Sequence, residues 1–552
     1  MFATLSGVGL PRRQNRKEQI NRNPGYHRRL VCEPLEDRRL LSVMPQMLGD
    51  LTPGADWTEL GEFTQVGDTV FFSSWGNADL WKTDGTPEGT VKVATVTDPG
   101  LNPDNAAIGG LVDVNGTLAF IVTDFDHVQL WKSDGTGLGT SRVHDFGLGS
   151  EIDIWDQTTY CAVGDRLFGA VSTTDTGYEL WVSDLTLGGT SLVKDINPGT
   201  DGSDPYDMIA FYDKLYFAAD DGTNGVELWV SDGTPGGTVM VKDIQTLPTL
   251  GSYPTGLTFA GDVFFFGVYI IGAPYDPFAY ANNKVQLWKS DGTPGNTVLV
   301  HDFGLGSSAP GVFDNPELTW FEETAMLFGV VEVDDGLGVR SRDLFVHNIL
   351  DNTTGRVANL NPDGNDFVMN LSPGAEGLLG FVADDGTHGL EPWVTNGTAI
   401  GTYMVKDIYP GGNDGVTGPA WWTPAAPFLD GAWYFPANDG VHGWELWKSD
   451  GTPDGTVLVA DIWPGEDAGW PNSSQPFKLT AALGKLFFAA TTEEYGEEPW
   501  VLDPATAPPI YDLMGRNAGN GDWWLGESNG VDAFTNSQVN RWNPSFEWAD
   551  VM

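Results

Sequence analysis

The pattern of hydrophobic and polar residues predicts a unit of four short strands over residues 206–244. Its second segment, residues 215–219, is continuously apolar, as expected for a strand that is covered on both faces. Strand-like segments at 227–231 and 239–244 follow, with the pair Asp232-Gly233 between them. Because Asp-Gly adopts positive backbone φ readily, it favours a tight hairpin. The unit is therefore predicted to be a sheet of four antiparallel strands.

The third strand of this unit and the turn after it recur along the chain, most clearly as Glu227-Leu-Trp-Val-Ser-Asp-Gly-Thr-Pro-Gly-Gly-Thr238. Consecutive copies place their central aromatic residue 48 to 59 residues apart. A unit repeated at this period cannot bury its own faces and stacks on its neighbours. We expect the aromatic side chains to fill the space between adjacent units. These predicted structural residues are Trp81, Trp131, Trp181, Trp229, Trp288, Trp393, Trp447 and Trp500, with Phe345 in a degenerate copy.

Four antiparallel strands in about 50 residues is the period of a β-propeller blade, so the sequence predicts an all-β propeller. The last unit supplies only three strands, over residues 477–502. Residues 48–54 match the end of a fourth strand at 193–199, so an N-terminal strand can complete the last blade and remove exposed sheet edges. This arrangement gives nine blades. Eight blades, with the degenerate unit near Phe345 squeezed out, is the alternative.

Charge and composition divide the chain into a basic leader (1–42), the repeat body (43–505) and a tail (506–552). The leader holds nine Lys/Arg and four Asp/Glu, whereas the whole chain has a formal net charge of −48. An acidic body repels nucleic acids, so we expect no nucleic-acid partner. The two cysteines, Cys32 and Cys161, give no disulfide framework, and no run of 18 apolar residues would span a membrane.

The repeat resembles the ELWxxDGT repeat family across the body, which implies a propeller-like extracellular repeat protein. The segment Glu33-Pro-Leu-Glu-Asp-Arg-Arg-Leu-Leu-Ser42 resembles the N-terminal motif of exported planctomycete surface proteins. That resemblance implies export, with the leader as an address and not a part of the fold. The tail resembles part of one FG-GAP-type repeat but ends before the calcium loop of that family, so no calcium ligand is carried over to it.

Two aspartates recur in most units, one in the Ser-Asp-Gly turn and one in the fourth strand. A catalytic group is needed once or twice, whereas a folding group is needed in every unit. Recurrence therefore favours hydrogen bonding to nearby backbone N–H groups. The turn positions are Asp84, Asp134, Asp232, Asp291 and Asp450, and the fourth-strand positions are Asp145, Asp195, Asp243, Asp302, Asp407 and Asp461.

Three Gly-rich loops between second and third strands are candidates for Ca²⁺, because this ion prefers six to eight oxygen ligands. The loops are Asp220-Asp-Gly-Thr-Asn-Gly225, Asp384-Asp-Gly-Thr-His-Gly389 and Asn438-Asp-Gly-Val-His-Gly443. Their spacing is not that of an EF-hand, and an ordinary hairpin is the alternative. The candidate ligands are Asp220, Asp221, Asp384, Asp385, Asn438 and Asp439.

No other motif predicts chemistry. The seven histidines show no zinc spacing, and His144 and His301 occupy a slot held elsewhere by lysine, which indicates a surface strand position. Carboxylates are too numerous to identify a glycosidase pair. Trp421-Trp422 and Trp523-Trp524 are able to stack on sugars, although packing between blades is the commoner use of Trp in this chain.

We therefore expect an exported, monomeric, cell-surface or extracellular module that is not an enzyme and serves binding, adhesion or matrix building. Its partner would be a glycan or a surface protein, contacted by loops on one face, with Ca²⁺ as the one cofactor suggested. The alternative is an extracellular propeller enzyme, a hydrolase or lyase acting on polysaccharide. Fold alone does not separate these, because propellers host both. A blade-specific cluster of unlike polar residues at the channel would favour the enzyme.

Overall fold

The structure is a computed structural model. It describes residues 44–53, 59–74, 78–98, 100–102, 105–124, 127–152, 156–247, 249–271, 284–305, 318–322, 324–334, 340–361, 367–375, 377–416, 425–467, 469–506, 511–516, 523–528 and 534–538. The predicted leader and Trp421-Trp422 lie outside these ranges, so the three-part division of the chain stays a prediction. Within the described residues, no helix is long and apolar enough to cross a membrane.

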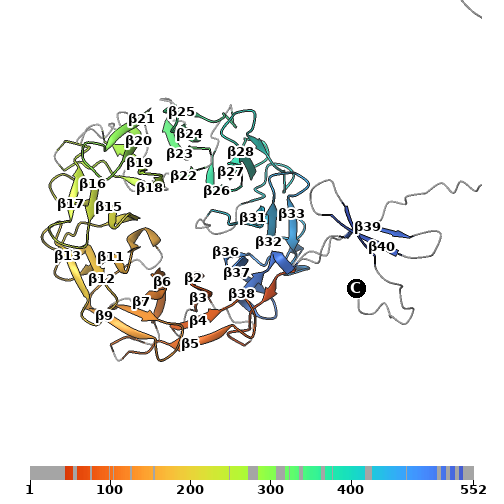
Figure 1. Ribbon diagram of the computed structural model, residues 1–552, viewed down its shortest axis with the longest axis horizontal. Coiled ribbons are helices and arrows are strands. Elements are labelled where there is room, and N and C mark those ends of the chain that lie inside the picture. The colour runs from red at the N-terminus through yellow and green to blue at the C-terminus, as the bar shows by residue number, and fades with distance from the viewer. Residues whose placement is uncertain are drawn as a thin grey trace, which may run out of the picture. The chain divides into compact units, whose positions relative to one another are not determined.

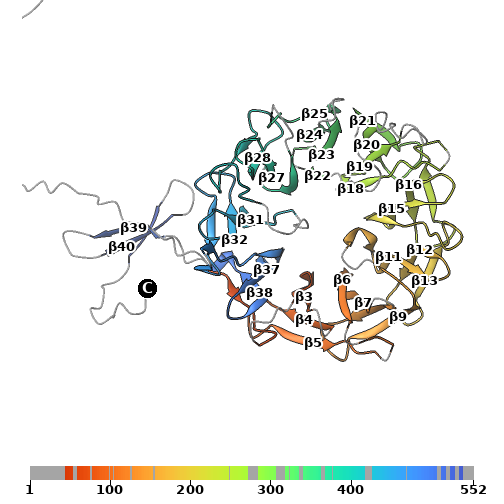
Figure 2. The ribbon, with the colours of Figure 1, turned by 180° about the vertical axis from the view of Figure 1, so that it is seen from behind.

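Nine four-stranded antiparallel sheets follow one another round a ring, which confirms the predicted nine-bladed propeller (Figure 1, Figure 2). Blade 1 contains β2 (Thr64–Val66), β3 (Thr69–Ser74), β4 (Asp79–Thr83) and β5 (Val91–Thr95). Blade 2 contains β6 (Ala107–Val114), β7 (Thr117–Thr123), β8 (His127–Ser133) and β9 (Ser141–Leu148). Blade 3 contains β10 (Tyr160–Val163), β11 (Arg166–Thr173), β12 (Gly177–Ser183) and β13 (Thr190–Lys194), preceded by the 3₁₀ turn η1 (Gln157–Thr159).

Blade 4 contains β14 (Tyr206–Phe211), β15 (Lys214–Asp220), β16 (Val226–Ser231) and β17 (Val239–Lys242). Blade 5 contains β18 (Thr255–Ala260), β19 (Val263–Ile270), β20 (Lys284–Ser290) and β21 (Val298–Leu305). Blade 6, the degenerate unit, is a full blade with β22 (Leu318–Phe321), β23 (Met326–Asp334), β24 (Arg340–Asn348) and β25 (Thr353–Arg356), so the eight-blade alternative is wrong.

Blade 7 contains β26 (Met369–Pro373), β27 (Leu379–Asp384), β28 (Leu390–Thr395) and β29 (Tyr403–Met404). Blade 8 contains β30 (Phe428–Leu429), β31 (Ala432–Asn438), β32 (Trp444–Ser449) and β33 (Val457–Ala460). A small hairpin of β34 (Glu466–Asp467) and β35 (Trp470–Pro471) follows it. In the tail, β39 (Tyr511–Arg516), β40 (Trp523–Ser528) and β41 (Phe534–Gln538) form a separate three-stranded sheet after the 3₁₀ turn η3 (Pro504–Thr506).

Blade 9 joins the two ends of the propeller. Its strands are β36 (Phe477–Ala482), β37 (Lys485–Thr492), β38 (Gly496–Leu502) and, as the outer strand, β1 (Gln46–Met47). Met47 pairs with Trp500, and the next backbone N–H, that of Leu48, donates to the Pro499 carbonyl over 2.8 Å. The predicted closure by an N-terminal fourth strand is confirmed, and it covers the edge that β38 would otherwise expose.

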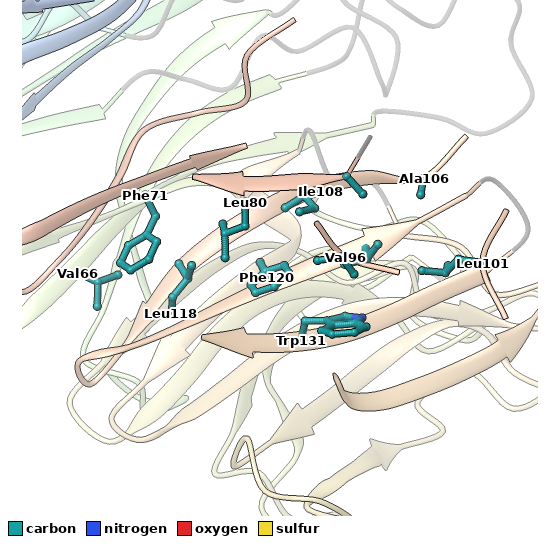
Figure 3. Close-up of a cluster of buried hydrophobic side chains, with 12 residues drawn as sticks. Val66, Phe71, Leu80, Val96, Leu101, Ala106, Ile108, Leu118, Phe120 and Trp131 are labelled. Carbon is teal, nitrogen blue, oxygen red and sulfur yellow. The ribbon is translucent and has the colours of Figure 1, made fainter. Parts of the chain in front are cut away.

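The hydrophobic core is a series of clusters between neighbouring blades. One of them joins Phe71 and Leu80 of blade 1 to Ile108, Phe120 and Trp131 of blade 2 (Figure 3). The second strands are apolar on both faces, as their sequences predict, because each is covered by the blade on either side. The fully buried aromatic residues of these strands are Phe72, Phe120, Phe168, Phe217, Phe264, Phe265, Phe266, Phe328, Phe487 and Phe488.

The fourth-strand slot of His144 is a contact between blades and not only a surface position. In blade 3 the slot holds Lys194, whose Nζ donates to the Thr238 carbonyl of blade 4 over 2.9 Å and lies 5.4 Å from the Trp229 ring centroid. In blade 2 the ring of His144 lies 6.0 Å from that of Trp181 in blade 3. The side chain in this slot therefore packs on the tryptophan of the next blade, through a cation–π contact where it is lysine.

Candidate functional site

The recurrent turn aspartates form hydrogen bonds within their own turns. The Thr234 hydroxyl and backbone N–H donate to Asp232 Oδ1 over 2.7 and 2.9 Å. The hydroxyl contact is the main reason that the pKa of Asp232 lies below its ordinary value. The same pair of contacts recurs at the other turn positions, from Asp84 to Asp450. The predicted folding role of these turn aspartates is confirmed.

The glutamate that begins each repeated motif has a role that sequence reasoning missed. Glu227 is fully buried, and its carboxylate accepts the backbone N–H groups of Ile244 and Gln245 over 3.1 and 3.0 Å. The Ser252 hydroxyl also donates to it, over 2.6 Å. Glu227 thus holds both the end of its own fourth strand and the segment that leads into blade 5. The equivalent buried glutamates are Glu179, Glu391, Glu445 and Glu498.

Burial dominates the electrostatics of these glutamates. It raises the pKa of Glu227, Glu391 and Glu445 to about 7, against the hydrogen bonds that favour the charged form. The pKa of Glu179 is raised for the same reason. A recurring Glu in an otherwise apolar strand is the signal that identifies them, because a buried carboxyl group is tolerated only where it finds partners.

The six calcium candidates lie in three loops, on blades 4, 7 and 8. Within each loop the pair is close together, but the three loops are separate. The second carboxylate of each loop is turned toward its own backbone: Asp221 Oδ1 accepts the N–H groups of Thr223 and Asn224 over 2.9 and 2.8 Å. Burial alone would raise the pKa of Asp221, but these hydrogen bonds outweigh it and lower that pKa.

Two of these loops also engage a histidine. His388 Nδ1 lies 2.7 Å from Asp385 Oδ2, and His442 Nδ1 lies 2.7 Å from Asp439 Oδ2. The first residue of each loop, such as Asp220, accepts the N–H of the glycine two positions on, over 2.7 Å. Across the described ranges, no group of three or more His, Cys, Asp or Glu side chains is arranged to hold a metal ion. As they stand, the loops are hydrogen-bonded hairpins.

A set of unlike polar residues lies where blade 9 meets blade 1. Lys478 Nζ donates to the Leu60 carbonyl, and Glu497 Oε1 accepts the Leu60 N–H over 2.8 Å. Burial lowers the pKa of Lys478, against the opposing effect of Glu497 and Glu62. Because both side chains bind the backbone of the neighbouring blade, this cluster has the geometry of a ring closure rather than of a catalytic pair.

The best-formed cavity found among the described residues lies between blades 7 and 8 and measures about 60 Å³. Its wall includes Phe381, Trp393 and Trp433, and the indole N–H of Trp433 donates to the Ser372 carbonyl over 3.0 Å. Ligand pockets usually measure about 300–1,000 Å³. This cavity is therefore a packing gap between blades and is too small for a sugar ring and its neighbours.

The predicted structural tryptophans lie between blades, and most are buried or half-buried. The indole N–H groups of Trp131 and Trp288 donate over 3.0 Å to the glutamines that replace the recurring glutamate, Gln129 and Gln286. In four blades that keep the glutamate, the indole N–H groups are buried without a hydrogen-bond partner, at Trp181, Trp229, Trp447 and Trp500. In blade 7, which also keeps it, the Trp393 N–H donates to the Ala383 carbonyl over 3.2 Å.

No protein-family model matches the chain, and a search of curated proteins finds no match. Among solved structures, a puromycin-hydrolysing peptidase from Mycobacterium tuberculosis is 10% identical over 71% of this chain and 59% of its own, with a TM-score of 0.37. An oligogalacturonate lyase from Vibrio parahaemolyticus is 14% identical over 64% of this chain and 92% of its own (TM-score 0.32). Sqt1 from Saccharomyces cerevisiae is 9% identical over 84% and 98%, with a TM-score of 0.37. The chain spans 58–61% of the length of the first peptidases. Likenesses this weak carry no argument about function.

Proposed function

We propose that this protein is an exported, non-catalytic module that binds a glycan or a surface protein at the cell surface or in the extracellular matrix. The observation that carries this proposal is that recurring polar residues form structural hydrogen bonds. The turn aspartates are occupied by their own turns and the buried third-strand glutamates by connections between blades, so the loops that differ from blade to blade are what remains for recognition. Binding would depend on the shape of these loops and on many weak contacts.

Export is proposed from the resemblance of residues 33–42 to an export motif and suits the acidic composition of the chain, which favours solubility. A monomer is proposed because the N-terminal strand closes the ring within one chain. Calcium is proposed only as a bridge between the three acidic loops and a ligand.

The test is retention of the full chain on insoluble polysaccharides and on intact cells, with analysis of any soluble products. The connections from second to third strand and from third to fourth strand lie at opposite ends of a blade. Val441→Glu, in a loop of the first kind and 69% exposed, is expected to weaken retention, whereas Leu138→Glu, in a turn of the second kind, is the matched control. Release of oligosaccharides would identify an enzyme, and no retention on any surface would indicate a scaffold.

Calcium is tested separately by thermal unfolding in EDTA and in millimolar Ca²⁺. An ion that binds only the folded state raises Tm by mass action. An increase of many degrees that is lost in Asp221→Asn or Asp385→Asn would support calcium in the loops. An unchanged Tm would leave them as plain turns and would direct the search to ligands that bind without metal.

A further inference from the structure

In several blades the third and fourth strands place acidic or amide side chains next to one another. In blade 2 Gln129 lies opposite Asp145, and in blade 5 Gln286 lies opposite Asp302. In blade 4 the neighbours are Glu227 and Asp243, close enough for the charge of Asp243 to disfavour ionisation of Glu227. Blades 1 and 6 carry a single buried aspartate, Asp79 or Asp343, on the third strand. These blades thus share one electrostatic problem, which is how to place negative charge at a largely buried position.

In four blades a basic side chain of the same blade forms an ion pair with one of these aspartates. None of these four blades has the third-strand glutamate. In blade 1 Lys92 pairs with Asp79 over 2.8 Å. In blade 2 both His127 and Arg142 reach Asp145, each over 3.0 Å. The pairs of blades 5 and 6 are Lys284 with Asp302 over 3.0 Å and Arg356 with Asp343 over 2.9 Å.

Blades 3, 4, 7 and 8 keep the glutamate and lack such a cation. Across the described part of the chain, no lysine or arginine forms an ion pair with these glutamates or with the fourth-strand aspartates beside them. The nearby Lys194, Lys242 and Lys406 instead donate to backbone carbonyls of the next blade over 2.9, 2.7 and 2.7 Å. The four pairs are Glu179 with Asp195, Glu227 with Asp243, Glu391 with Asp407, and Glu445 with Asp461.

The other titratable groups near these pairs add little positive charge. Tyr206 faces Glu227, and Asp207 and Tyr253 lie near Tyr206. Asp414 faces Glu391, as does His388, which is held by Asp385. Asp461, beside Glu445, has His442 and Asp439 as its charged neighbours. Only the two histidines are basic, and each is paired with its own loop aspartate.

We propose that blades 3, 4, 7 and 8 take up protons where blades 1, 2, 5 and 6 hold a basic side chain, so that the propeller tightens as the medium changes from mildly alkaline to mildly acidic. The blade-to-blade pattern supports this proposal directly. A neutral side chain already stands at the same position in blades 2 and 5, where Gln129 and Gln286 accept the indole N–H of the neighbouring tryptophan. A protonated glutamate presents a similar neutral group.

The direction of the pKa shifts determines whether stability rises or falls with pH. Burial raises the pKa of Glu227, Glu391 and Glu445 from the ordinary 4.5 to about 7. The folded chain therefore binds more protons than the unfolded chain between these values, and stability falls as pH rises through about 7. The turn aspartates, such as Asp232, have lowered pKa values and act oppositely, but only at pH values near and below 3.8. The two effects do not overlap.

The location of the glutamates gives this proton uptake a structural consequence. Each one holds the end of a fourth strand and, at Glu179, Glu227 and Glu445, a serine of the segment that enters the next blade. Ionisation at these positions places negative charge without a basic partner in the connections between blades. Those connections and the acidic loops lie at the same end of each blade, so loosening them also changes the face proposed for binding.

The test compares thermal unfolding of the full chain between pH 5 and pH 8.5 in EDTA. The variant is Glu179→Gln, Glu227→Gln, Glu391→Gln and Glu445→Gln combined, and Asp232→Asn is the matched control. We expect the Tm of the natural chain to fall by several degrees toward pH 8.5, and the quadruple variant to lose most of that fall. Asp232→Asn should show the same fall in Tm toward pH 8.5, because the Asp232 carboxylate affects stability only at pH values near and below 3.8.

A second measurement keeps the proposal falsifiable if the quadruple variant does not fold. Protons released by the natural chain on unfolding at pH 6 are counted by pH-stat, and release of more than one proton per chain is expected. A Tm that is flat or rises toward pH 8.5, or no release of protons, would overturn the proposal. So would restoration of the pH 8.5 Tm by Ca²⁺ in the natural chain only, since a metal ion and not a proton would then fill the pairs.

Discussion

The closure of the ring makes a sharp prediction about one side chain near the N-terminus. Leu48 is 1% exposed and packs with Phe72 of blade 1 and with Phe487 and Val501 of blade 9. Leu48→Ala removes three carbon atoms from the junction on which closure depends. Replacement of a fully buried Leu by Ala costs about 2–5 kcal/mol, as lost transfer free energy and a residual cavity. We expect about 3 kcal/mol here, because neighbouring rings leave little room for the site to collapse.

The assay is equilibrium unfolding by guanidinium, followed by tryptophan fluorescence, together with a thermal scan. A cooperative unit of this size has an unfolding entropy on the order of 1 kcal/mol per kelvin, so about 3 kcal/mol lowers Tm by about 3 °C. Met44→Ala is the control, because Met44 is in the same segment but 62% exposed. A surface change of this kind should stay within about 0.5 kcal/mol.

Hydrogen exchange separates closure from a general loss of stability. In Leu48→Ala, amide exchange should accelerate first in β38, whose outer edge β1 covers, and later in blades far from the junction. If Leu48→Ala unfolds together with Met44→Ala and the natural chain, then the N-terminal strand does not hold the ring closed. The reasoning about closure would then be wrong.

Three further outcomes are expected. Trp229→Ala should cost about 3–5 kcal/mol in chemical unfolding, because its buried ring also carries the cation–π contact from Lys194, and Trp229→Phe should cost less. Asp232→Ala should cost about 1 kcal/mol near neutral pH through the loss of its turn hydrogen bonds, with the difference from the natural chain shrinking as pH falls below about 4. In a Cys32→Ser background, Cys161 should alkylate slowly at pH 8 until the protein unfolds, because burial raises its pKa to about 11; fast labelling of the folded protein would contradict this.

The repeat and its closure were predictable because each blade is specified locally. A continuous apolar segment indicates a second strand, and the Asp-Gly turn fixes the hairpin that follows, as in residues 214–242. The absence of a fourth strand after residue 502 and the surplus strand at the N-terminus together require closure. Even the degenerate blade 6 was countable, because Phe345 keeps the place of the tryptophan in the repeated motif.

The irregular first strands were not predictable. Tyr206 pairs with Ala218 and Ile209 with Tyr216, so the register shifts between them, and Asp207 adopts a φ of 54°. Lys478 in blade 9 lies at the same point of its strand, also with a φ of 54°. A period-two pattern continues through such a bulge without any local signal. The backbone departs from the strand because the residue reaches the neighbouring blade, as Lys478 does at Leu60, and that contact is invisible in sequence.

The structural role of the third-strand glutamate was not predicted, for a related reason. It recurs in the repeated motif, yet the partners that explain it, Ile244 and Ser252 for Glu227, are 17 and 25 residues away. The calcium candidates show the reverse situation. Their oxygens are close together in sequence, which predicted a set of calcium ligands. In the structure Asp221 and Asp385 accept hydrogen bonds from their own loops, and this local turn chemistry is an adequate explanation of the pattern.

The distribution of built-in cations links the repeat to its behaviour as a whole. Blades 1 and 2 hold a basic partner, blades 3 and 4 do not, blades 5 and 6 do, and blades 7 and 8 do not. The protonatable pairs therefore lie in two arcs, separated on one side by blades 5 and 6 and on the other by blades 9, 1 and 2. Because each blade contacts only its neighbours, a change in charge within an arc acts on the connections inside that arc. A ring of near-identical units can thus respond unevenly to pH, and this unevenness arises from a few substitutions, such as Gln for Glu, rather than from a separate domain.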